Sequence, residues 1–377
     1  MHRKHVAFIL EQAYGHIIPT LGITLELLRR GHRVSYAVTD RFASSLIRIG
    51  AEVAVFDQLE TRSPICQAAQ TADGGYDFTG EPHLDSLIRD LGVRRTADSV
   101  SKLELAYSGN RPDIVIHDDD LDTTGRELAL KWGIPKIRYN HCYLTKEDMR
   151  FFEEDDLIIV TVPKFMNQNP DSFEERFHFV GFIPEGRREF FEPWKFNTDA
   201  EKVIVASATT GLLPQVEFCK LMIDAFGNQP WRVILTPGGR HDPISEVKED
   251  MFSSLPDNFT INRASSILEI VERACLFIGQ GGQGSILEAL YHGVPLLMIP
   301  SASFQEQLAD HLEELGLARR LLAPDISAEG VRSAAVATLN DTEILQRVRQ
   351  ARHSMHEDRG AILAAGLIEN RLLASGM

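Results

Sequence analysis

Short apolar runs alternate with amphipathic stretches along the first half of the chain. Residues 6–10 form a continuous apolar run, and leucine and isoleucine recur at helical spacing from there to Gly31. A second apolar run covers residues 34–38, and after another helical stretch that stops at Gly50 a third covers residues 53–56. This β-α-β-α-β order predicts a parallel sheet with right-handed crossovers.

The same alternation continues after one long irregular segment. Residues 57–80 lack a period and predict a loop, whereas residues 84–107 predict a long helix. A strand is expected over residues 113–117 and a helix over residues 126–132, after which a further strand begins at residues 133–135. These elements follow the same strand-then-helix rule.

The second half repeats the pattern after a break. Residues 183–199 mix proline, glycine, charged and aromatic side chains without a period, so we predict a domain boundary there. Strands are then expected over residues 203–206, 231–235, 259–261 and 276–278, with helices over residues 216–226 and 266–273. The predicted fold is α/β, with two doubly wound, Rossmann-like domains facing across a cleft. Ligands of such sheets bind beyond the carboxyl ends of the strands, so the cleft is the expected active site.

Length and composition agree with a folded, water-soluble chain. Its 377 residues suit two domains of ~150 to 200 residues each. Hydrophobic residues make up 44% and charged residues 25%, which is typical of globular proteins. Acidic residues exceed basic ones by 54 − 39 = 15, which disfavours nucleic acid and anionic lipid surfaces as partners. The acidic stretches 153–156 and 246–250 are expected to be solvated surface.

The cysteines and the hydropathy of the chain indicate where the protein is located and whether it binds a metal ion. The four cysteines, Cys66, Cys142, Cys219 and Cys275, are dispersed and form no CxxC pair, so neither a zinc site nor a redox motif is indicated. No stretch approaches the ~20 apolar residues that a transmembrane helix needs. A cytoplasmic protein with reduced thiols and no metal is therefore expected.

A glycine-rich turn carries the most specific local signal. The segment IGQGGQGSILEAL, residues 278–290, follows a predicted strand and opens a helix. Gly281, Gly282 and Gly284 would let backbone N–H groups approach an anion such as a diphosphate. The spacing is not GxGxxG, which disfavours a nicotinamide cofactor. On these residues alone, a tight β-α turn that needs glycine only for packing is an equal alternative.

Two kinds of candidate catalytic residue follow strands of the first domain. His16 lies just past the first strand, and an imidazole that titrates near neutral pH suits a general base. A packing or helix-capping histidine is the alternative. Asp118, Asp119, Asp120 and Asp122 follow a later strand, and one of them is expected to face the cleft as the carboxylate that orients a base. A solvated loop with a helix cap at Asp122 is the alternative for this run.

The chain resembles GT-B glycosyltransferases of the UDP-glycosyltransferase superfamily, in particular the bacterial branch that glycosylates macrolides and other natural products. Four collinear segments carry the resemblance: YGHIIPTLGITLELLRRGHRVSYAV from residue 14, PDIVIHDDD from residue 112, LPDNFTINRASSILEIVERACLFIGQGGQG from residue 255 and HGVPLLMIPSASFQEQLADHLEELGLA from residue 292. They span nearly the whole chain in the family's order.

The resemblance implies a domain plan and an activity. Residues 1–182 would form an acceptor-binding domain, residues 183–199 a linker, residues 200–360 a nucleotide-sugar-binding domain, and residues 361–377 a C-terminal helix that packs back on the N-terminal domain. The implied enzyme is an inverting hexosyltransferase that moves a sugar from a UDP- or TDP-sugar to a hydroxyl group of a natural product. A lipophilic or large acceptor is implied, with no cofactor besides the sugar nucleotide, and a homodimer is left open.

On the acceptor side, the resemblance favours a catalytic role for the histidine over a packing or helix-capping role. Gly15, His16 and Pro19 match the family's GHxxP segment, which makes His16 the base that takes the acceptor's proton. The family's base-orienting aspartate directly follows the corresponding strand and matches Asp118. Counting back from the end of the next helix favours Asp119 instead, so both stay open.

On the donor side, the resemblance implies contacts with the diphosphate, the ribose and the sugar. The positions that it assigns to the donor are Thr210, Gln280, Gly281, Gly282, Gly284, Ser285, Glu288, Phe304 and Gln305. Glu288 corresponds to the residue that touches the ribose, and Gln305 to the glutamine that hydrogen-bonds sugar hydroxyls. Thr210 and the glycine turn correspond to the phosphate contacts.

Several positions depart from the family pattern. Gln280 stands where relatives carry a diphosphate-binding histidine, Phe304 replaces an aspartate of the sugar pocket, and Ala264 and Ile267 replace the tryptophan and glutamine that hold the nucleobase. If the alignment with the family is shifted by two residues, Glu306-Gln307 supplies an acid-glutamine pair. The spacing to the flanking residues then no longer matches the family. These departures leave two alternatives open, namely a helper protein that binds a true glycosyltransferase and an enzyme that uses an unusual sugar nucleotide.

Overall fold

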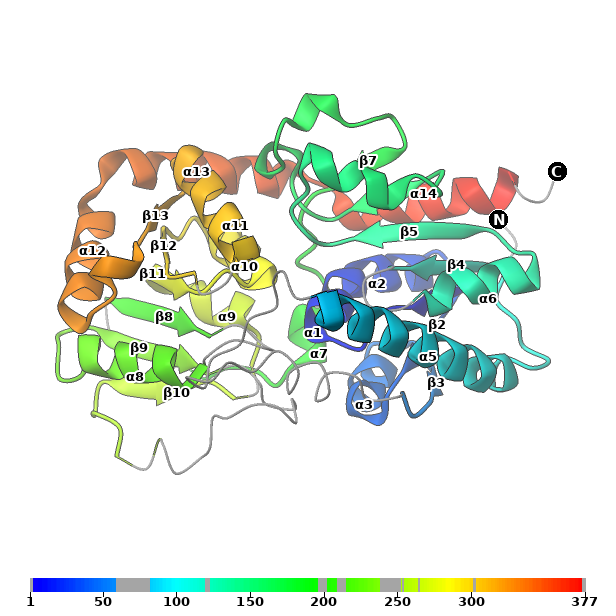
Figure 1. Cartoon of the computed structure of the whole chain (residues 1–377), viewed down its shortest axis with the longest axis horizontal. Coiled ribbons are helices and arrows are strands. Elements are labelled where there is room, and N and C mark those ends of the chain that lie inside the picture. The colour runs from blue at the N-terminus through cyan, green and yellow to red at the C-terminus, as the bar shows by residue number, and fades with distance from the viewer. Residues whose placement is uncertain are drawn as a thin grey trace. The chain divides into compact units, whose positions relative to one another are not determined.

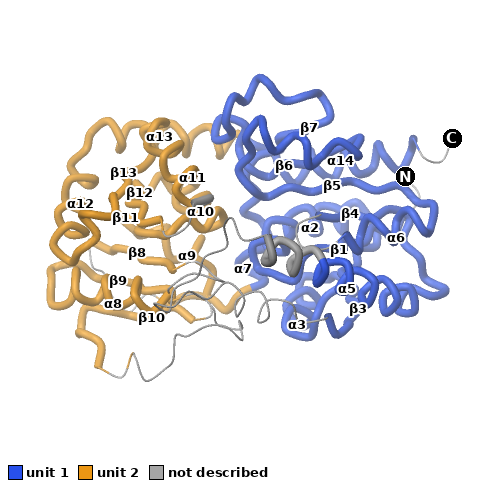
Figure 2. The backbone as a smooth tube through the Cα atoms, viewed as in Figure 1, with its two compact units in different colours: residues 1–190, 358–377 blue, residues 191–357 orange. Residues whose placement is uncertain are grey.

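A computed structural model of the chain shows two compact units (Figure 2). Unit 1 comprises Met1–Phe190 and Asp358–Met377, and unit 2 comprises Phe191–Glu357. The division at Phe190 falls within residues 183–199, where we predicted the linker. The structure describes residues 3–58, 82–118, 123–195, 202–208, 215–237, 252, 254–263, 265–300 and 303–374, with the backbone alone for residues 82–89, 303 and 304.

The described part of unit 1 contains one seven-stranded parallel sheet with the order β3-β2-β1-β4-β5-β6-β7 (Figure 1). The strands are β1 (His5–Ile9), β2 (Arg33–Val38), β3 (Glu52–Val55), β4 (Ile114–His117), β5 (Lys136–Asn140), β6 (Ile158–Val160) and β7 (Phe177–Phe179). The chain winds outward from β1 to β3 and then returns to add β4 on the other side of β1. The direction of winding therefore reverses between β1 and β4.

Helices surround this sheet. They are α1 (Tyr14–Ile17), η1 (Ile18–Thr20), α2 (Leu21–Arg29), α3 (Asp40–Arg48), α5 (Pro82–Ala106), α6 (Thr124–Trp132), η2 (Lys146–Phe152), η3 (Lys164–Met166), η4 (Pro170–Ser172), α7 (Arg187–Phe190) and α14 (Gly360–Ala374). The C-terminal α14 packs on α2. Glu369 of α14 accepts a hydrogen bond of 2.5 Å from Arg30 Nη1 and lies 3.0 Å from His32 Nε2. These bonds tie α14 to the turn between α2 and β2.

The centre of this sheet is apolar because both of its faces are covered. All residues of β1 are buried, as its continuous apolar run predicts for a parallel strand between two helical layers. Helix α6 approaches the sheet closely at Gly125, where a Cβ atom would lie 2.6 Å from the Cβ of His117 and 2.9 Å from the carbonyl oxygen of Ile9. Glycine at this position thus holds α6 against the ends of β1 and β4.

Unit 2 repeats the architecture with a six-stranded parallel sheet in its described part, ordered β10-β9-β8-β11-β12-β13. Its strands are β8 (Val203–Ser207), β9 (Arg232–Thr236), β10 (Phe259–Ile261), β11 (Ala274–Gly279), β12 (Leu296–Met298) and β13 (Ala318–Arg320). Its helices are α8 (Gln215–Phe226), α9 (Ile267–Val271), α10 (Gln283–His292), α11 (Ser303–Glu314), η6 (Ala323–Asp325), α12 (Ala328–Asn340) and α13 (Thr342–Glu357). The winding reverses here between β8 and β11.

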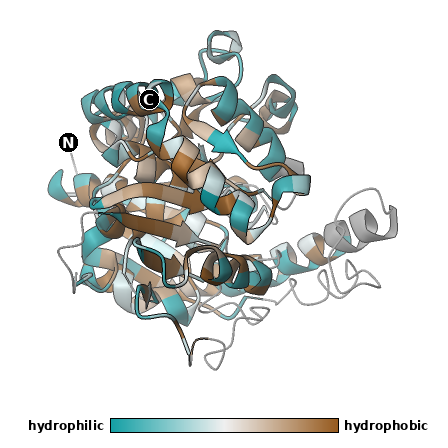
Figure 3. Ribbon diagram, turned by 90° about the vertical axis from the view of Figure 1, so that its left-hand side faces the viewer, coloured by the Kyte–Doolittle hydropathy of each residue, from teal (hydrophilic) through white to brown (hydrophobic). Residues whose placement is uncertain are grey.

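The two sheets confirm the predicted fold class of two doubly wound α/β domains. Apolar residues are concentrated in the strands, whereas hydrophilic residues lie along the outer sides of the helices (Figure 3). A large apolar cluster of unit 2 joins β8, β9 and β11 to α8 and α12. No helix in the described residues is long and apolar enough to cross a membrane.

Candidate active site

His16 and Asp118 meet where the winding of unit 1 reverses. In doubly wound sheets, ligands bind beyond the carboxyl ends of the strands at this reversal. His16 lies on α1, just after β1, and Asp118 directly follows β4. His16 Nδ1 is 2.7 Å from Asp118 Oδ2, and the two side chains are 12% and 8% exposed. The carboxylate can only accept, so Nδ1 carries the proton and Nε2 is the nitrogen that can act as a base.

A second hydrogen bond fixes the aspartate. Asp118 Oδ1 accepts from the backbone N–H of Glu11 at 2.9 Å, so the carboxylate is held at both oxygens. Of the two aspartates that the sequence left open, Asp118 contacts His16. Asp119 lies outside the described residues, as do Asp120 and Asp122.

The helical turn that carries His16 is anchored to the sheet. The hydroxyl of Thr20 donates to the carbonyl oxygen of Ile17 at 2.7 Å and lies 2.6 Å from the hydroxyl of Tyr36 on β2. The Thr24 hydroxyl is 2.7 Å from the same phenol oxygen. Tyr36 is 1% exposed, and its burial raises its pKa above the ordinary range. The uncharged phenol therefore serves as a fixed hydrogen-bonding group under the turn.

Sequence reasoning missed a second histidine beside His16. His141 follows β5, and its ring centroid lies 4.1 Å from that of His16. Desolvation, and secondarily the charge of His16, lower the pKa of His141 well below its ordinary value, so this imidazole is neutral at pH 7. Its position just past a strand adjoining β4 is a signal that could have identified it.

Gln12 was also missed, although it organises the same loop. Its side-chain amide donates to the carbonyl oxygens of Leu10, at 2.8 Å, and Ala37, at 3.0 Å. Its side-chain oxygen accepts from the N–H of Thr39 at 2.9 Å. Gln12 thus joins the loops that follow β1 and β2, and it is 6% exposed.

In unit 2, the glycine turn lies where the winding of the second sheet reverses. Gly281 has a φ of +120°, and a Cβ atom there would lie 2.9 Å from the Cβ of Gln305. Gly282 is the N-cap of α10, and no side chain caps this helix. A Cβ atom on Gly282 or Gly284 would meet no described atom within 4 Å. The first turn of α10 is partly exposed and has no side-chain cap, so its backbone N–H groups are suited to an anion.

The other donor positions differ in exposure. Gln280, Glu288 and Gln305 are 3%, 5% and 0% exposed, whereas Ser285 is partly exposed. Gln305 lies beneath the turn, against Gly281. Thr210 falls outside the described residues, and for Phe304 only the backbone in α11 is described. The structure thus brings Gln305 to the glycine turn.

The loop expected at the nucleobase is held by another residue that sequence reasoning missed. Asn262 follows β10 and is 3% exposed. Its side-chain oxygen accepts from the N–H of Ser265 at 3.0 Å, and its amide donates to the carbonyl of the same residue at 3.1 Å and to Thr236 Oγ1 at 3.3 Å. Ile267 begins α9 just beyond this loop, and Ala264 lies outside the described residues.

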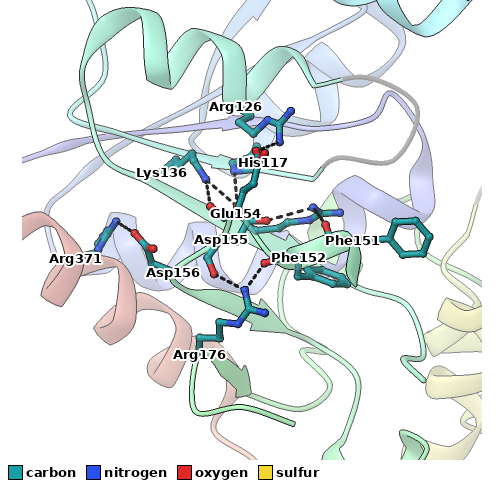
Figure 4. Close-up of polar contacts among 11 residues, drawn as sticks. His117, Arg126, Lys136, Phe151, Phe152, Glu154, Asp155, Asp156, Arg176 and Arg371 are labelled. Carbon is teal, nitrogen blue, oxygen red and sulfur yellow. Dashed lines mark hydrogen bonds and ion pairs between the residues drawn. The ribbon is translucent and has the colours of Figure 1, made fainter. Parts of the chain in front are cut away.

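The expectation of a solvated surface at residues 153–156 is wrong for one residue. Asp155 is 3% exposed and binds two cations of β5, Lys136 at 2.8 Å (Figure 4) and Arg138 at 3.2 Å. His117 Nε2 lies 3.9 Å from the same carboxylate. Two neighbours do lie outward, because Glu154 and Asp156 are 76% and 77% exposed. The cations of the adjacent strand account for the burial of Asp155.

The two doubly wound units have the architecture of the GT-B class of glycosyltransferases, and comparisons with known proteins place the chain in that class. Residues 232–359 match the glycosyltransferase family 28 C-terminal domain. The chain is 30% identical to the NDP-glycosyltransferase YjiC of Bacillus licheniformis over 100% of both chains. It is 27% identical to the demethyllactenocin mycarosyltransferase of Streptomyces fradiae, over 98% of this chain and 86% of that one. The crystal structure of CalG4, the calicheamicin glycosyltransferase, superposes with a TM-score of 0.78 at 23% identity and covers 99% of each chain.

The likeness extends over the whole chain and includes both sheets. The chain therefore belongs to the GT-B UDP-glycosyltransferase superfamily, and it is a glycosyltransferase.

Proposed function

We propose that this enzyme is an inverting transferase that moves a sugar from a UDP- or TDP-sugar to a hydroxyl group of a lipophilic small molecule such as a macrolide or another antibiotic. The similarity to a mycarosyltransferase named for demethyllactenocin supports this acceptor class. A short connection between β5 and β6, which contains only the seven-residue η2, favours a large or flat acceptor.

His16 is the proposed base. The acceptor hydroxyl gives its proton to Nε2 while its oxygen bonds to the anomeric carbon, and the bond from that carbon to the diphosphate breaks with its electrons on the phosphate oxygen. Asp118 accepts the hydrogen bond from Nδ1–H and stabilises the imidazolium that forms. Attack on the side opposite the leaving group inverts the anomeric centre. The scheme requires that the sugar held by unit 2 reach the hydroxyl group at His16.

Unit 2 is the proposed donor-binding half. The first turn of α10 offers N–H groups and the positive end of a helix dipole to the diphosphate. Gly281, Gly282, Gly284 and Ser285 form this cradle, and Gln280 adds an uncharged amide. Glu288 is proposed for the ribose, and Thr210, Phe304 and Gln305 for the phosphates and the sugar. Within the described residues no three His, Cys, Asp or Glu side chains are grouped to hold a metal ion.

One observation carries the proposal: His16 Nδ1 lies 2.7 Å from a carboxylate that is itself fixed by Glu11, which is the arrangement a general base requires. Calorimetry with UDP and TDP tests the donor half. We expect binding of at least one of them at micromolar to low millimolar concentration. Absence of binding by both would remove the donor assignment.

Turnover measurements test the part of the proposal that concerns the acceptor and the base. With a panel of UDP- and TDP-sugars and a macrolide aglycone, His16→Ala is expected to lower kcat by about 10²- to 10⁴-fold, with diphosphate binding intact. Asp118→Asn is expected to lower kcat because the amide can donate to Nδ1 and favour the wrong tautomer. His353→Ala, on a side chain that is 81% exposed, is the matched control. Full activity of His16→Ala would overturn the assignment of the base.

A cytoplasmic location is the remaining part of the proposal. Three cysteines in the described residues, Cys142, Cys219 and Cys275, are free thiols, as is usual in a reducing compartment. Fractionation of the source cells with antibody detection tests it, and recovery of the protein outside the cytoplasmic fraction would refute it.

A further inference from the structure

We propose that the buried ion pair of Glu11 and Arg95 positions Asp118, so that α5 holds the carboxylate in the geometry that His16 needs. This inference rests on the proposed function, because it concerns the same base. Asp118 Oδ1 accepts from the N–H of Glu11, and Asp118 Oδ2 binds His16. Any shift of the backbone at Glu11 therefore moves the carboxylate.

The side chain of Glu11 fixes this backbone through a second contact. Its carboxylate Oε2 pairs with Arg95 Nη2 of α5, and the two residues are 5% and 2% exposed. Charges this deeply buried must stay paired, because an unpaired one loses its hydration without compensation. The pair consequently tolerates little movement, and it links α5 to the residue whose N–H holds Asp118.

The next residue of α5 contacts a part of the chain that follows Asp118 in the sequence. Thr96 Oγ1 accepts from the backbone N–H of Thr123 at 3.2 Å. Thr123 is the first described residue after Asp118 and precedes α6. Two consecutive residues of α5 thus hold Glu11, whose N–H binds Asp118, and Thr123, which follows Asp118 in the chain.

An exposed pair on the same helix shows what an ordinary surface contact looks like here. Lys102 and Asp98 lie 2.8 Å apart with side chains 41% and 36% exposed, and they touch neither β1 nor β4 by any described bond. Such pairs contribute little to stability. Asp98→Asn is therefore the matched control for Glu11→Gln, since each replaces one carboxylate that pairs with α5.

The positioning role is tested by a measurement that a change in stability alone would not affect. In full-length protein carrying ¹⁵N-histidine, the Nδ1–H resonance of His16 reports its hydrogen bond to Asp118. We expect Glu11→Gln to shift this resonance or to broaden it, and to lower kcat by about ten- to hundredfold with the donor KM within about twofold. Asp98→Asn should leave the resonance and both constants unchanged. An unchanged His16 resonance in folded Glu11→Gln would overturn the inference.

A second variant covers the case in which Glu11→Gln does not fold. The double variant Glu11→Gln with Arg95→Gln removes both charges and leaves no unpaired ion, so it should fold and still show the altered His16 resonance. A normal resonance in the folded double variant would overturn the inference. The resonance needs no substrate. If the variants show the predicted change in resonance but the wild-type chain transfers no sugar, only the proposed function is refuted.

Discussion

The imidazole rings of His16 and His141 lie with their centroids 4.1 Å apart and their planes tilted by 58°. Two protonated rings at this distance would repel each other. Desolvation and the neighbouring charge lower the pKa of His141, so that it is neutral where the enzyme is expected to work. Because the ring of His141 is neutral, His16 can take a proton without a second positive charge beside it, but the buried ring of His141 makes the folded state sensitive to acid.

We predict that stability falls as the pH drops from 7 to 5 and that His141→Asn reduces this fall. In the unfolded chain His141 titrates near 6.5, and its pKa is lower in the folded chain, so the unfolded state binds more protons in this window. The stabilisation is complete above about pH 6.5 and is lost as the pH falls towards the folded pKa. The contribution of this one imidazole to the fall is at most about 2 kcal/mol between pH 7 and pH 5.

Urea unfolding at pH 7 and pH 5 measures this difference between the wild type and His141→Asn. Desolvation also lowers the pKa values of His5 and His178, so the wild type is compared with single variants and not with a calculated total. His353→Asn, at an exposed site, should behave like the wild type. An equal pH dependence for His141→Asn and the wild type would contradict the prediction.

Gly281→Ala is expected to destabilise unit 2 by about 2 kcal/mol or more. The added Cβ would lie 2.9 Å from Gln305, and the φ of +120° is unfavourable for any L side chain. Gln305 is fully buried, so it cannot move into solvent to make room. Chemical denaturation followed by fluorescence measures the change, and a variant as stable as the wild type would show that the turn relaxes freely.

Gly284→Ala should separate folding from donor binding. The position lies in the first turn of α10 with no described atom within 4 Å of the added Cβ, so alanine should raise stability by about 0.5 kcal/mol. The same methyl group would occupy the space in front of the helix, and we expect UDP or TDP to bind about tenfold more weakly. Gly366→Ala in α14 is the control for a helical glycine away from the turn. Unchanged nucleotide affinity in Gly284→Ala, measured by calorimetry, would argue against the cradle.

Continuous apolar runs made the centres of both sheets predictable, whereas the outer strands β7 and β13 were not predicted. Strand β7 has only three residues, Phe177–Phe179, and β13 has three with two arginines, Ala318–Arg320. Runs this short carry no measurable period, and each pairs with a single neighbour, so the adjoining strand decides that they form.

Candidate site residues could be predicted where they directly follow a strand. They were harder to predict where the residues that contact them are distant in the sequence. The position of His16 after β1 could be inferred, but the choice between Asp118 and Asp119 depended on register. Ile9 pairs with His117, so Asp118 is the first residue beyond the paired strands. Glu11 and Arg95 are 84 residues apart, and no local pattern relates them.

Asp155 illustrates the same limit and yields the last prediction. The sequence EEDD at residues 153–156 is typical of solvated surface, yet Asp155 neutralises Lys136 and Arg138 at 3% exposure. Asp155→Asn keeps the shape but leaves two cations without their carboxylate, and we expect a loss of about 3 to 5 kcal/mol. Asp171→Asn breaks the pair with Lys164, in which the aspartate is 95% exposed, and should change stability by less than about 1 kcal/mol. Equal losses in the two variants, measured by urea unfolding at pH 7, would show that the burial of Asp155 does not set its contribution.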